Sequence, residues 1–273
     1  MTVTIDAHEL KAQLASDDPP VLLDVRWALG DSEGREHYRD AHIPGAVFVD
    51  LDNELASHGE PSDGRHPLPE ISDLQNAARS WGIGSGSRVV AYDNTGNLAA
   101  ARAWWLLRWG GLTDVTLLDG GLTSWTAAGF ETASGDEIPA PGDVELTPGH
   151  LPTLTADEIA SYSGTLLDAR APERYSGETE PIDPKAGHIP GAINAPTAAN
   201  LDADGRFLSA DALRERFDSA GADVAVYCGS GVTAAHQIAA LAIAGVDAAL
   251  YPGSWSQWSN QPNRPVATGV SPR

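Results

Sequence analysis

The sequence contains two copies of one unit, and this duplication limits the possible folds more than any other feature of the chain. The segment 21–27, VLLDVRW, returns as TLLDARA at 165–171, and HIPGA occurs at 42–46 and again at 188–192. The offset is 144 residues for the first pair (165 minus 21) and 146 residues for the second (188 minus 42). Matches that keep their order and spacing predict two domains of the same fold in tandem.

The segment between the copies, 132–149, reads TASGDEIPAPGDVELTPG and has no hydrophobic periodicity. Its prolines and glycines are typical of a linker that runs over a surface. The expected domains are therefore 1–131 and 150–273. The pattern Thr155-x-x-Glu158 is a capping box and predicts a helix start near the beginning of the second domain.

Each copy alternates short apolar runs with amphipathic or alanine-rich segments. Such runs are buried on both faces, which is typical of parallel strands joined by crossover helices. The expected fold class is α/β, with two duplicated domains that each contain a parallel β-sheet flanked by helices. The runs lie at 21–25, 88–93 and 115–119 in the first copy and at 165–169, 224–228 and 248–251 in the second.

The charge of the chain excludes some partners. There are 17 basic and 38 acidic side chains, which gives a formal net charge of −21. Such a surface repels nucleic acids and anionic membranes, so neither is an expected partner. A small anionic substrate requires a local cluster of arginine or lysine side chains to bind against this field.

The expected location is the cytoplasm. No apolar stretch is long enough to span a membrane, and the N-terminal segment has neither the basic start nor the apolar block of a secretory signal. The chain has one cysteine and therefore cannot form an internal disulfide, so its fold does not need an oxidising compartment.

That cysteine, Cys228, lies where the apolar run 224–227 meets the loop Gly229-Ser230-Gly231 and a helical pattern that ends near Gly245. A lone cysteine is usually a small buried hydrophobe. However, sites in open α/β sheets form at the carboxyl ends of strands, beside helix N-termini. A glycine-rich turn there directs backbone N–H groups inward, where they stabilise a thiolate. Cys228 is therefore predicted to be a nucleophile.

The first copy has Asp93 at the position of Cys228. A carboxylate cannot accept and carry a sulfur atom as a thiolate does. We therefore expect the domain 1–131 to be catalytically silent and to serve a structural role.

These motifs together resemble the two-domain rhodanese-type sulfurtransferases over essentially the whole chain. The resemblance rests on the paired HIPGA motifs, the DAR at 168–170, the loop CGSGVTA at 228–234 and the GSW at 253–255. The loop is most similar to the 3-mercaptopyruvate form of the family. The thiosulfate-specific form carries two basic residues where this chain has Gly229 and Ser230.

The resemblance implies a persulfide on Cys228, formed from a small anionic sulfur donor with release of pyruvate, and no cofactor or metal. The acceptor would be a thiol, a thioredoxin-like protein or cyanide. Ser230 is a candidate catalytic residue whose hydroxyl can bond the sulfur or the leaving group. The other loop residues are expected to bind the substrate: Gly229, Gly231, Val232 and Thr233.

The carboxylate of the donor needs a cation, and Arg174 matches the family position that binds it. Related enzymes specific for mercaptopyruvate carry a second arginine where this chain has Ile182. Lys185 is the nearest substitute in the sequence and is a candidate binding residue. Arg170 is another nearby cation, but it follows the first strand of its copy, as Arg26 does. A structural ion pair with Asp168, like that of Arg26 with Asp24, is therefore at least as good an interpretation of Arg170 as a role in binding the donor.

Three histidines have alternative interpretations. His42 and His188 both begin HIPGA, which favours a hydrogen-bonded role in a turn. His42 is also a candidate for proton transfer, on the hypothesis that the first domain faces the active loop. His236 is expected to pack in the core.

Other functions remain open in the sequence. Cysteine phosphatases need an arginine six residues after the cysteine, and here that position is Ala234, which argues against them. Within the family, the alternatives are a thiosulfate:cyanide sulfurtransferase and a non-catalytic sulfur-carrier or regulatory module. The neutral loop favours mercaptopyruvate as the donor.

Overall fold

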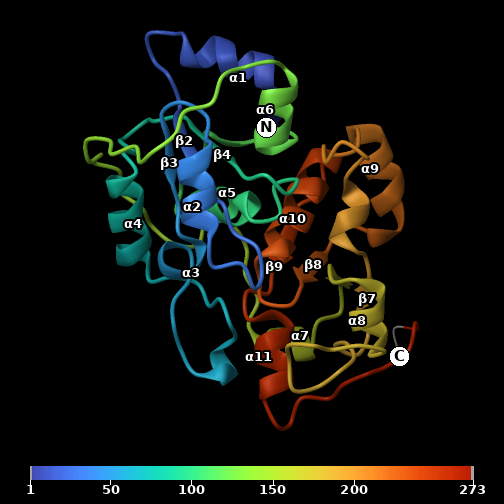
Figure 1. The fold of residues 1–273 in the computed structure, drawn as a ribbon. Coiled ribbons are helices and arrows are strands. Elements are labelled where there is room, and N and C mark those ends of the chain that lie inside the picture. Colours follow the sequence, from blue (N-terminus) through green and yellow to red (C-terminus); the bar gives the residue numbers. More distant parts are fainter. Residues whose placement is uncertain (1, 272–273) are drawn as a thin grey trace. The chain divides into compact units, whose positions relative to one another are not determined.

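The computed structural model describes residues 2–271 and divides into two compact units (Figure 1). Two short segments pack with one unit, although the residues on either side of them in the chain belong to the other unit. The segment 57–68 packs with the C-terminal unit and 203–207 with the N-terminal unit. The N-terminal unit comprises Met1–Ala56, Pro69–His150 and Ala203–Phe207, and the C-terminal unit comprises Ser57–Leu68, Leu151–Asp202 and Leu208–Arg273.

The expected linker 132–149 is counted with the N-terminal unit. Its residue Ala133 forms an isolated bridge with His42, and the side chains of Val144 and Leu146 are buried. These apolar contacts explain why the segment packs as part of that unit although it has no regular structure.

The N-terminal unit is built on a five-stranded sheet of order β1-β5-β4-β2-β3 in which every pair is parallel. The core strand β4 is buried along its whole length, as its unbroken apolar sequence predicts. The strands are β1 (Thr4–Ile5), β2 (Val21–Asp24), β3 (Ala46–Phe48), β4 (Val89–Tyr92) and β5 (Val115–Leu118). The helices are α1 (Ala7–Leu14), α2 (Gly34–Asp40), α3 (Leu51–Glu54), α4 (Ile71–Ser80), α5 (Ala100–Trp109) and α6 (Gly121–Ala127).

The C-terminal unit has a four-stranded parallel sheet of order β7-β6-β8-β9. Its core contains Tyr227, Trp255 and Trp258. The strands are β6 (Thr165–Asp168), β7 (Ile193–Asn194), β8 (Val224–Tyr227) and β9 (Ala248–Leu250). The helices are α7 (Ala156–Ala160), α8 (Pro172–Ser176), α9 (Ala210–Phe217), α10 (Thr233–Ala244) and α11 (Ser254–Asn260), with single 3₁₀ turns at η1 (Pro61–Asp63), η2 (Thr197–Asn200) and η3 (Asp218–Ala220).

These two sheets confirm the predicted α/β class and the repeat. Strands β4 and β8 are equivalent, and each pairs with the strand that precedes HIPGA in its own copy. The predicted capping box is present, because the Thr155 side chain accepts from Glu158 N and the Glu158 carboxylate accepts from Thr155 N. Gly245 ends α10 in the left-handed conformation, with φ of 83°.

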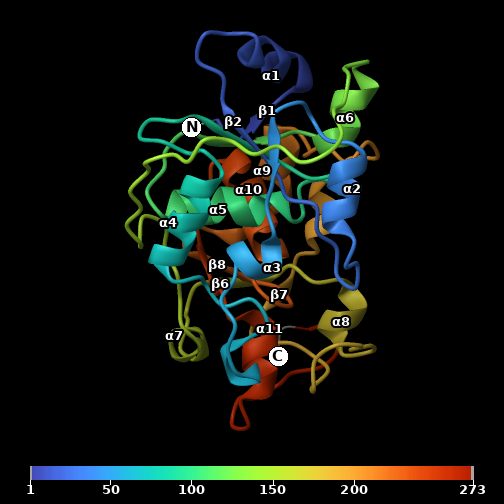
Figure 2. The ribbon, with the colours of Figure 1, turned by 60° about the vertical axis from the view of Figure 1, so that its left-hand side comes forward.

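The segment 57–68 is the part of the C-terminal unit that most affects its site. In Figures 1 and 2 it runs beside α11, and the two elements are in contact. The backbone N–H of Arg65 donates to Ser256 Oγ at 3.1 Å. Gly64 adopts a φ of +94°, and a Cβ there would lie 2.9 Å from the carbonyl oxygen of Gly253, so glycine is required for this contact.

Within residues 2–271, no helix is long and apolar enough to cross a membrane.

Candidate active site

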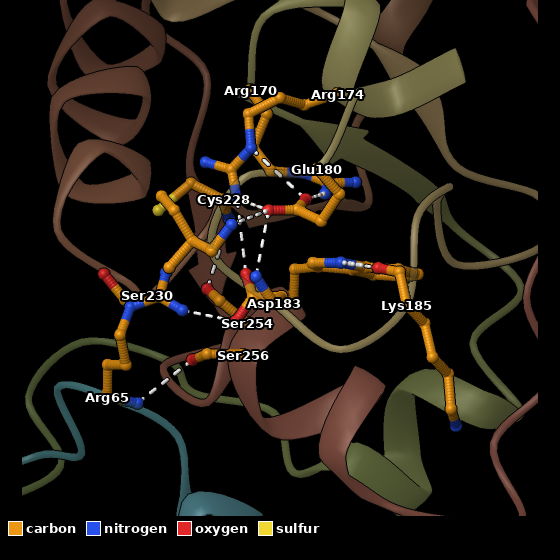
Figure 3. Close-up of polar contacts among 12 residues, drawn as sticks. Arg65, Arg170, Arg174, Glu180, Asp183, Lys185, Cys228, Ser230, Ser254 and Ser256 are labelled. Atoms are coloured by element: carbon orange, nitrogen blue, oxygen red, sulfur yellow. Dashed lines mark hydrogen bonds and ion pairs between the residues drawn. The ribbon is translucent and has the colours of Figure 1, made fainter. Parts of the chain in front are cut away.

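Cys228 lies immediately after β8, at the carboxyl end of the central strand pair of its unit (Figure 3). Its thiol is free and the residue is only 1% exposed. The backbone N–H of Gly231 donates to Cys228 Sγ at 3.1 Å. Gly231 has a φ of 83°, a conformation that favours glycine, and α10 begins two residues later at Thr233. The turn therefore brings a backbone donor and a helix N-terminus to the sulfur.

The start of α11 holds the loop from the other side. Trp255 N donates to the carbonyl oxygen of Cys228 at 3.0 Å, and Ser256 N donates to that of Gly229 at 2.8 Å. Ser254 has a φ of 52°, which is strained for a residue with a side chain. Its hydroxyl accepts from Cys228 N at 3.1 Å and donates to Tyr251 O at 2.9 Å. These bonds fix the backbone that carries the thiol.

Ser230 pairs with His66, a histidine outside the sequence motifs described above. The Oγ of Ser230 is hydrogen-bonded to Nδ1 of His66 at 2.8 Å, and both residues are 8% exposed. His66 belongs to the segment 57–68 and follows Arg65. A buried hydroxyl–imidazole pair one residue away from Gly229 is suited to moving a proton close to the thiol.

A signal for this segment was present in the repeat. The tripeptide DGR occurs at 63–65 and again at 204–206, an offset of 141 residues (204 minus 63) that fits the series of the other matches. The two DGR segments are also the two that pack with the opposite unit. Sequence reasoning could have found the repeat, but not that packing, because it depends on tertiary contacts.

Arg174 lies in a cluster of buried charges beside the loop. Its Nε and Nη2 donate to the two carboxylate oxygens of Glu180 at 3.2 and 2.7 Å, and Nη2 also donates to Asp183 at 3.2 Å. Asp183 has a second partner, because Nη1 of Arg65 donates to its other oxygen. Asp183 therefore bridges two guanidinium groups, one from α8 and one from the segment 57–68.

The cluster is balanced in charge. Arg170 donates to both oxygens of Asp168 and lies 3.4 Å from a carboxylate oxygen of Glu180. Burial raises the pKa of Asp183, and the Arg65 guanidinium opposes that rise. Three cations face three anions in this cluster: Arg65, Arg170 and Arg174 against Asp168, Glu180 and Asp183.

The structure corrects the expected role of Lys185. The ammonium of Lys185 donates to Gln261 O at 2.9 Å, and Figure 3 shows its side chain running away from Cys228. The main-chain carbonyl of Lys185 accepts from Trp255 Nε1 at 3.0 Å. Lys185 therefore anchors the core of the unit, and the cation that accompanies Arg174 beside the loop is Arg65.

His42 and His188 have equivalent, fully buried positions in their own units. Each ring stacks on a tyrosine, and each Nδ1 bonds the carbonyl oxygen of that tyrosine: Tyr38 at 2.9 Å and Tyr175 at 2.8 Å. This symmetry supports the turn interpretation. It gives no support to the proton-transfer hypothesis for His42, whose burial is that of a packing residue.

Three further expectations are confirmed by contacts. Arg26 pairs with Asp24 and Arg170 with Asp168, which is the symmetric ion pair considered above. His236 is fully buried and bonds Thr197 Oγ1 at 2.6 Å.

The loop of the first copy binds its own carboxylate. Asp93 Oδ1 accepts from Thr95 N at 2.8 Å and Asn97 N at 2.7 Å, and Oδ2 accepts from Ala99 N at 2.8 Å and Ala100 N at 3.1 Å. These four N–H groups surround an anion as the nest of a glycine-rich turn does. In this copy the anion is a side chain of the protein itself.

The loop residues predicted to bind substrate lie in the turn after β8 and at the start of α10. Gly229, Ser230, Gly231 and Val232 connect Cys228 to α10, and Thr233 is the first residue of that helix. Their roles in binding stay predictions. The arrangement combines a thiol, a backbone donor, a hydroxyl–imidazole pair and two guanidinium groups, which suits transfer of a group from an anionic donor.

Comparison with known proteins identifies the fold. The family model described as a rhodanese-like domain matches residues 6–128 and 152–261. The crystal structure of Escherichia coli SseA, described as a 3-mercaptopyruvate sulfotransferase, superposes with a TM-score of 0.81 at 30% identity, covering 93% of this chain and 99% of that one.

Two relatives match over nearly their whole length. A Mycobacterium tuberculosis protein that carries the name of a thiosulfate sulfurtransferase, SseB, is 46% identical and covers 98% of each chain. A Pseudomonas aeruginosa protein named as a 3-mercaptopyruvate sulfurtransferase is 45% identical over 97% of this chain and 98% of its own. The chain therefore belongs to the rhodanese-like family, in its two-domain sulfurtransferase form.

Proposed function

We propose that the protein transfers a sulfane sulfur from 3-mercaptopyruvate to a thiol or cyanide through a persulfide on Cys228. The observation that carries this proposal is the surroundings of the thiol. Cys228 is the only cysteine, a backbone N–H donates to its sulfur, and the Ser230–His66 pair lies in the same loop. A buried thiol with these neighbours is suited to nucleophilic catalysis.

The first half-reaction forms the persulfide. The Cys228 thiolate attacks the donor sulfur, a sulfur–sulfur bond forms and the donor carbon–sulfur bond breaks. The electron pair of that bond passes to the pyruvate enolate, which takes up the proton of the donor thiol and leaves as pyruvate. Ser230 and His66 are hydrogen-bonded to each other and are suited to carrying this proton.

The second half-reaction returns the enzyme to its starting state. An acceptor thiolate or cyanide attacks the outer sulfur of the persulfide, and the sulfur–sulfur bond breaks. Its electron pair returns to Cys228 as the thiolate, and the product carries the transferred sulfur. The Gly231 N–H that donates to Sγ stabilises the sulfur anion at both stages.

The choice of donor follows from charge. The loop itself is neutral, but the site is not free of cations, because Arg65 and Arg174 lie beside Gly229. Their carboxylate partners bring the cluster to zero net charge. Thiosulfate is a dianion, so it brings one more negative charge to this balanced cluster than a donor with one carboxylate does. One interaction between unit charges at 4 Å contributes about 4 kcal/mol at an effective dielectric of 20. The donor with one negative charge therefore disturbs the balance less.

Thiosulfate is the second candidate donor. It is favoured by the pair of guanidinium groups at the loop and by the name of the M. tuberculosis relative.

The N-terminal unit is proposed to be catalytically silent, since its nest is filled by Asp93. A cytoplasmic location is also proposed, and the single free cysteine suits a reducing compartment.

The proposal is tested by comparing kcat/KM for 3-mercaptopyruvate and thiosulfate with one common acceptor. We expect mercaptopyruvate to be the better donor by roughly 10- to 1,000-fold, the ratio that corresponds to about 1.4–4 kcal/mol. Faster turnover of thiosulfate would assign the protein to the second candidate function, and absence of transfer from both donors would leave a carrier or regulatory role.

A further inference from the structure

The thiol that must meet the sulfur acceptor is closed off in this structure. Cys228 is only 1% exposed, and the hydrogen-bonded pair Ser230 and His66 in the adjoining loop is also buried. Reacting atoms must come to about 3–3.5 Å from each other. Cyanide and small thiols are slender, but a cysteine on the surface of a folded protein cannot come this close to so deeply buried a residue. Some element of the unit therefore has to move before a protein thiol can attack the persulfide.

The loop that carries the thiol and the elements on either side of it are poorly suited to this movement. Strand β8, before Cys228, is buried along its whole length, and most residues of α10, after the loop, are buried as well. Hydrogen bonds from the start of α11 hold the backbone of Cys228 and Gly229. Moving any of these elements would expose apolar core side chains to water.

The segment 57–68 is built differently. Its ends are tied together, because Ser57 N donates to the carbonyl oxygen of Pro67 at 3.2 Å, and hydrogen bonds between Glu60 and Asp63 hold its middle. A short surface segment with joined ends and internal bonds is an Ω-loop, and its construction allows it to move as one body. The structure describes all of its residues, and none of their apolar side chains is buried.

Polar contacts hold this segment against the rest of the unit. Arg65 N donates to Ser256 Oγ at 3.1 Å (Figure 3), the Arg65 guanidinium donates to Asp183, and His66 is bonded to Ser230. Such bonds are exchanged for bonds to water when the segment lifts, so each contributes little net free energy to closure. An element with few buried apolar contacts opens more readily than the core around it.

We propose that the segment 57–68 is a lid over the Cys228 loop, closed while the donor reacts and open when the persulfide meets a thiol of a folded protein. This inference rests on the proposed function, because it concerns the acceptor of the same persulfide. Closure places His66 and Arg65 beside the loop for the first half-reaction, and opening uncovers the loop for the second. Cyanide and small thiols react in the closed state, so lid opening limits transfer to protein thiols alone.

The test loosens the lid with Ser256→Ala, which removes the acceptor of the Arg65 N–H but keeps the backbone N–H that bonds Gly229. Enzyme persulfide is formed with 3-mercaptopyruvate, freed of donor and mixed with reduced thioredoxin as the protein thiol, or with cyanide or 2-mercaptoethanol. Intact mass follows the loss of sulfur from Cys228. Transfer to thioredoxin should rise roughly 3- to 10-fold, the effect of one hydrogen bond on the open population, and transfer to the two small acceptors should stay within about twofold of wild type.

Gly64→Ala is a second and stronger variant. A Cβ at this position, where φ is +94°, would lie 2.9 Å from the carbonyl oxygen of Gly253, so the lid cannot close fully. Transfer to thioredoxin should rise at least as much as in Ser256→Ala. Sulfur uptake from 3-mercaptopyruvate should fall, because His66 and Arg65 are displaced with the lid. Opposite changes in the two half-reactions are the signature of a lid, whereas damage to the structure of the site would slow both.

Ser259→Ala is the matched control. Ser259 is a buried serine of the same helix, α11, and within residues 2–271 its hydroxyl has no hydrogen-bond partner, so every rate should match wild type. Unchanged transfer to thioredoxin in both lid variants would overturn the inference, and so would an equal change for thioredoxin and the small acceptors. Failure of wild type to take up sulfur from any donor would instead contradict the proposed function, so the two failures are distinguishable.

Discussion

At the scale of single residues, the chemistry depends on pairs that the chain brings together from distant positions. Ser230 is hydrogen-bonded to His66. Arg174 and Arg65 are joined through Asp183, whose carboxylate accepts a hydrogen bond from each of them. Each pair joins a residue of the second copy to one from the segment 57–68. In the proposed mechanism the loop supplies the nucleophile, and this segment places an imidazole and a guanidinium group beside it.

The Ser230–His66 pair is expected to act as a unit. Ser230→Ala and His66→Asn should each lower kcat/KM roughly 10- to 100-fold, because either change removes the route for the proton. The double variant should lose little more than either single variant, since the second change removes nothing further. Independent, multiplying losses in a double-mutant cycle would show that the hydrogen bond is not functional.

The charge balance at Asp183 is expected to set the donor preference. Asp183→Asn removes one negative charge, so the ratio of kcat/KM for thiosulfate to that for mercaptopyruvate should rise by about tenfold or more. In wild type the same ratio should rise as the pH falls toward the raised pKa of Asp183, because protonation also removes that charge. If neither the substitution nor the pH changes this ratio, the Asp183 carboxylate does not set the donor preference.

At the scale of elements, the two copies use one design for different purposes. A buried parallel strand ends in a turn whose N–H groups face inward, and a helix follows. In the second copy the turn holds the thiol of Cys228. In the first copy it holds the carboxylate of Asp93, which accepts four backbone hydrogen bonds.

Asp93 is therefore expected to stabilise the N-terminal unit. Asp93→Ala leaves four inward-facing N–H groups without their acceptor and should lower the free energy of unfolding by about 2–4 kcal/mol. Urea denaturation measures this difference. Asp17→Ala changes an exposed aspartate of the same unit and should have little effect. Equal stability of the two variants would mean that the nest does not need its carboxylate.

At the scale of the whole molecule, the repeat and the strand patterns made the fold predictable. Apolar runs located the central strands to within about a residue, and the capping box at Thr155 and the glycine at 245 marked helix ends correctly. These signals are local, so they can be seen in the sequence. The carboxyl end of β8 then placed Cys228 and its loop.

The rest of the site could not be predicted because it depends on contacts between segments far apart in the sequence. Arg65 and His66 reach the loop only because the segment 57–68 packs against α11. Lys185 was the nearest cation in sequence, yet its ammonium bonds the carbonyl oxygen of Gln261. Distance along the chain was a poor guide to distance from the thiol.

The central claim is that Cys228 carries the transferred sulfur, and intact-mass measurement after incubation with 3-mercaptopyruvate and no acceptor tests it most directly. The account predicts one added sulfur atom per chain, located on Cys228 and released when a thiol or cyanide is added. Cys228→Ser should remain folded, gain no sulfur and transfer none. A Ser variant with near wild-type turnover, or a wild-type enzyme that turns over without a sulfur adduct, would contradict the persulfide mechanism.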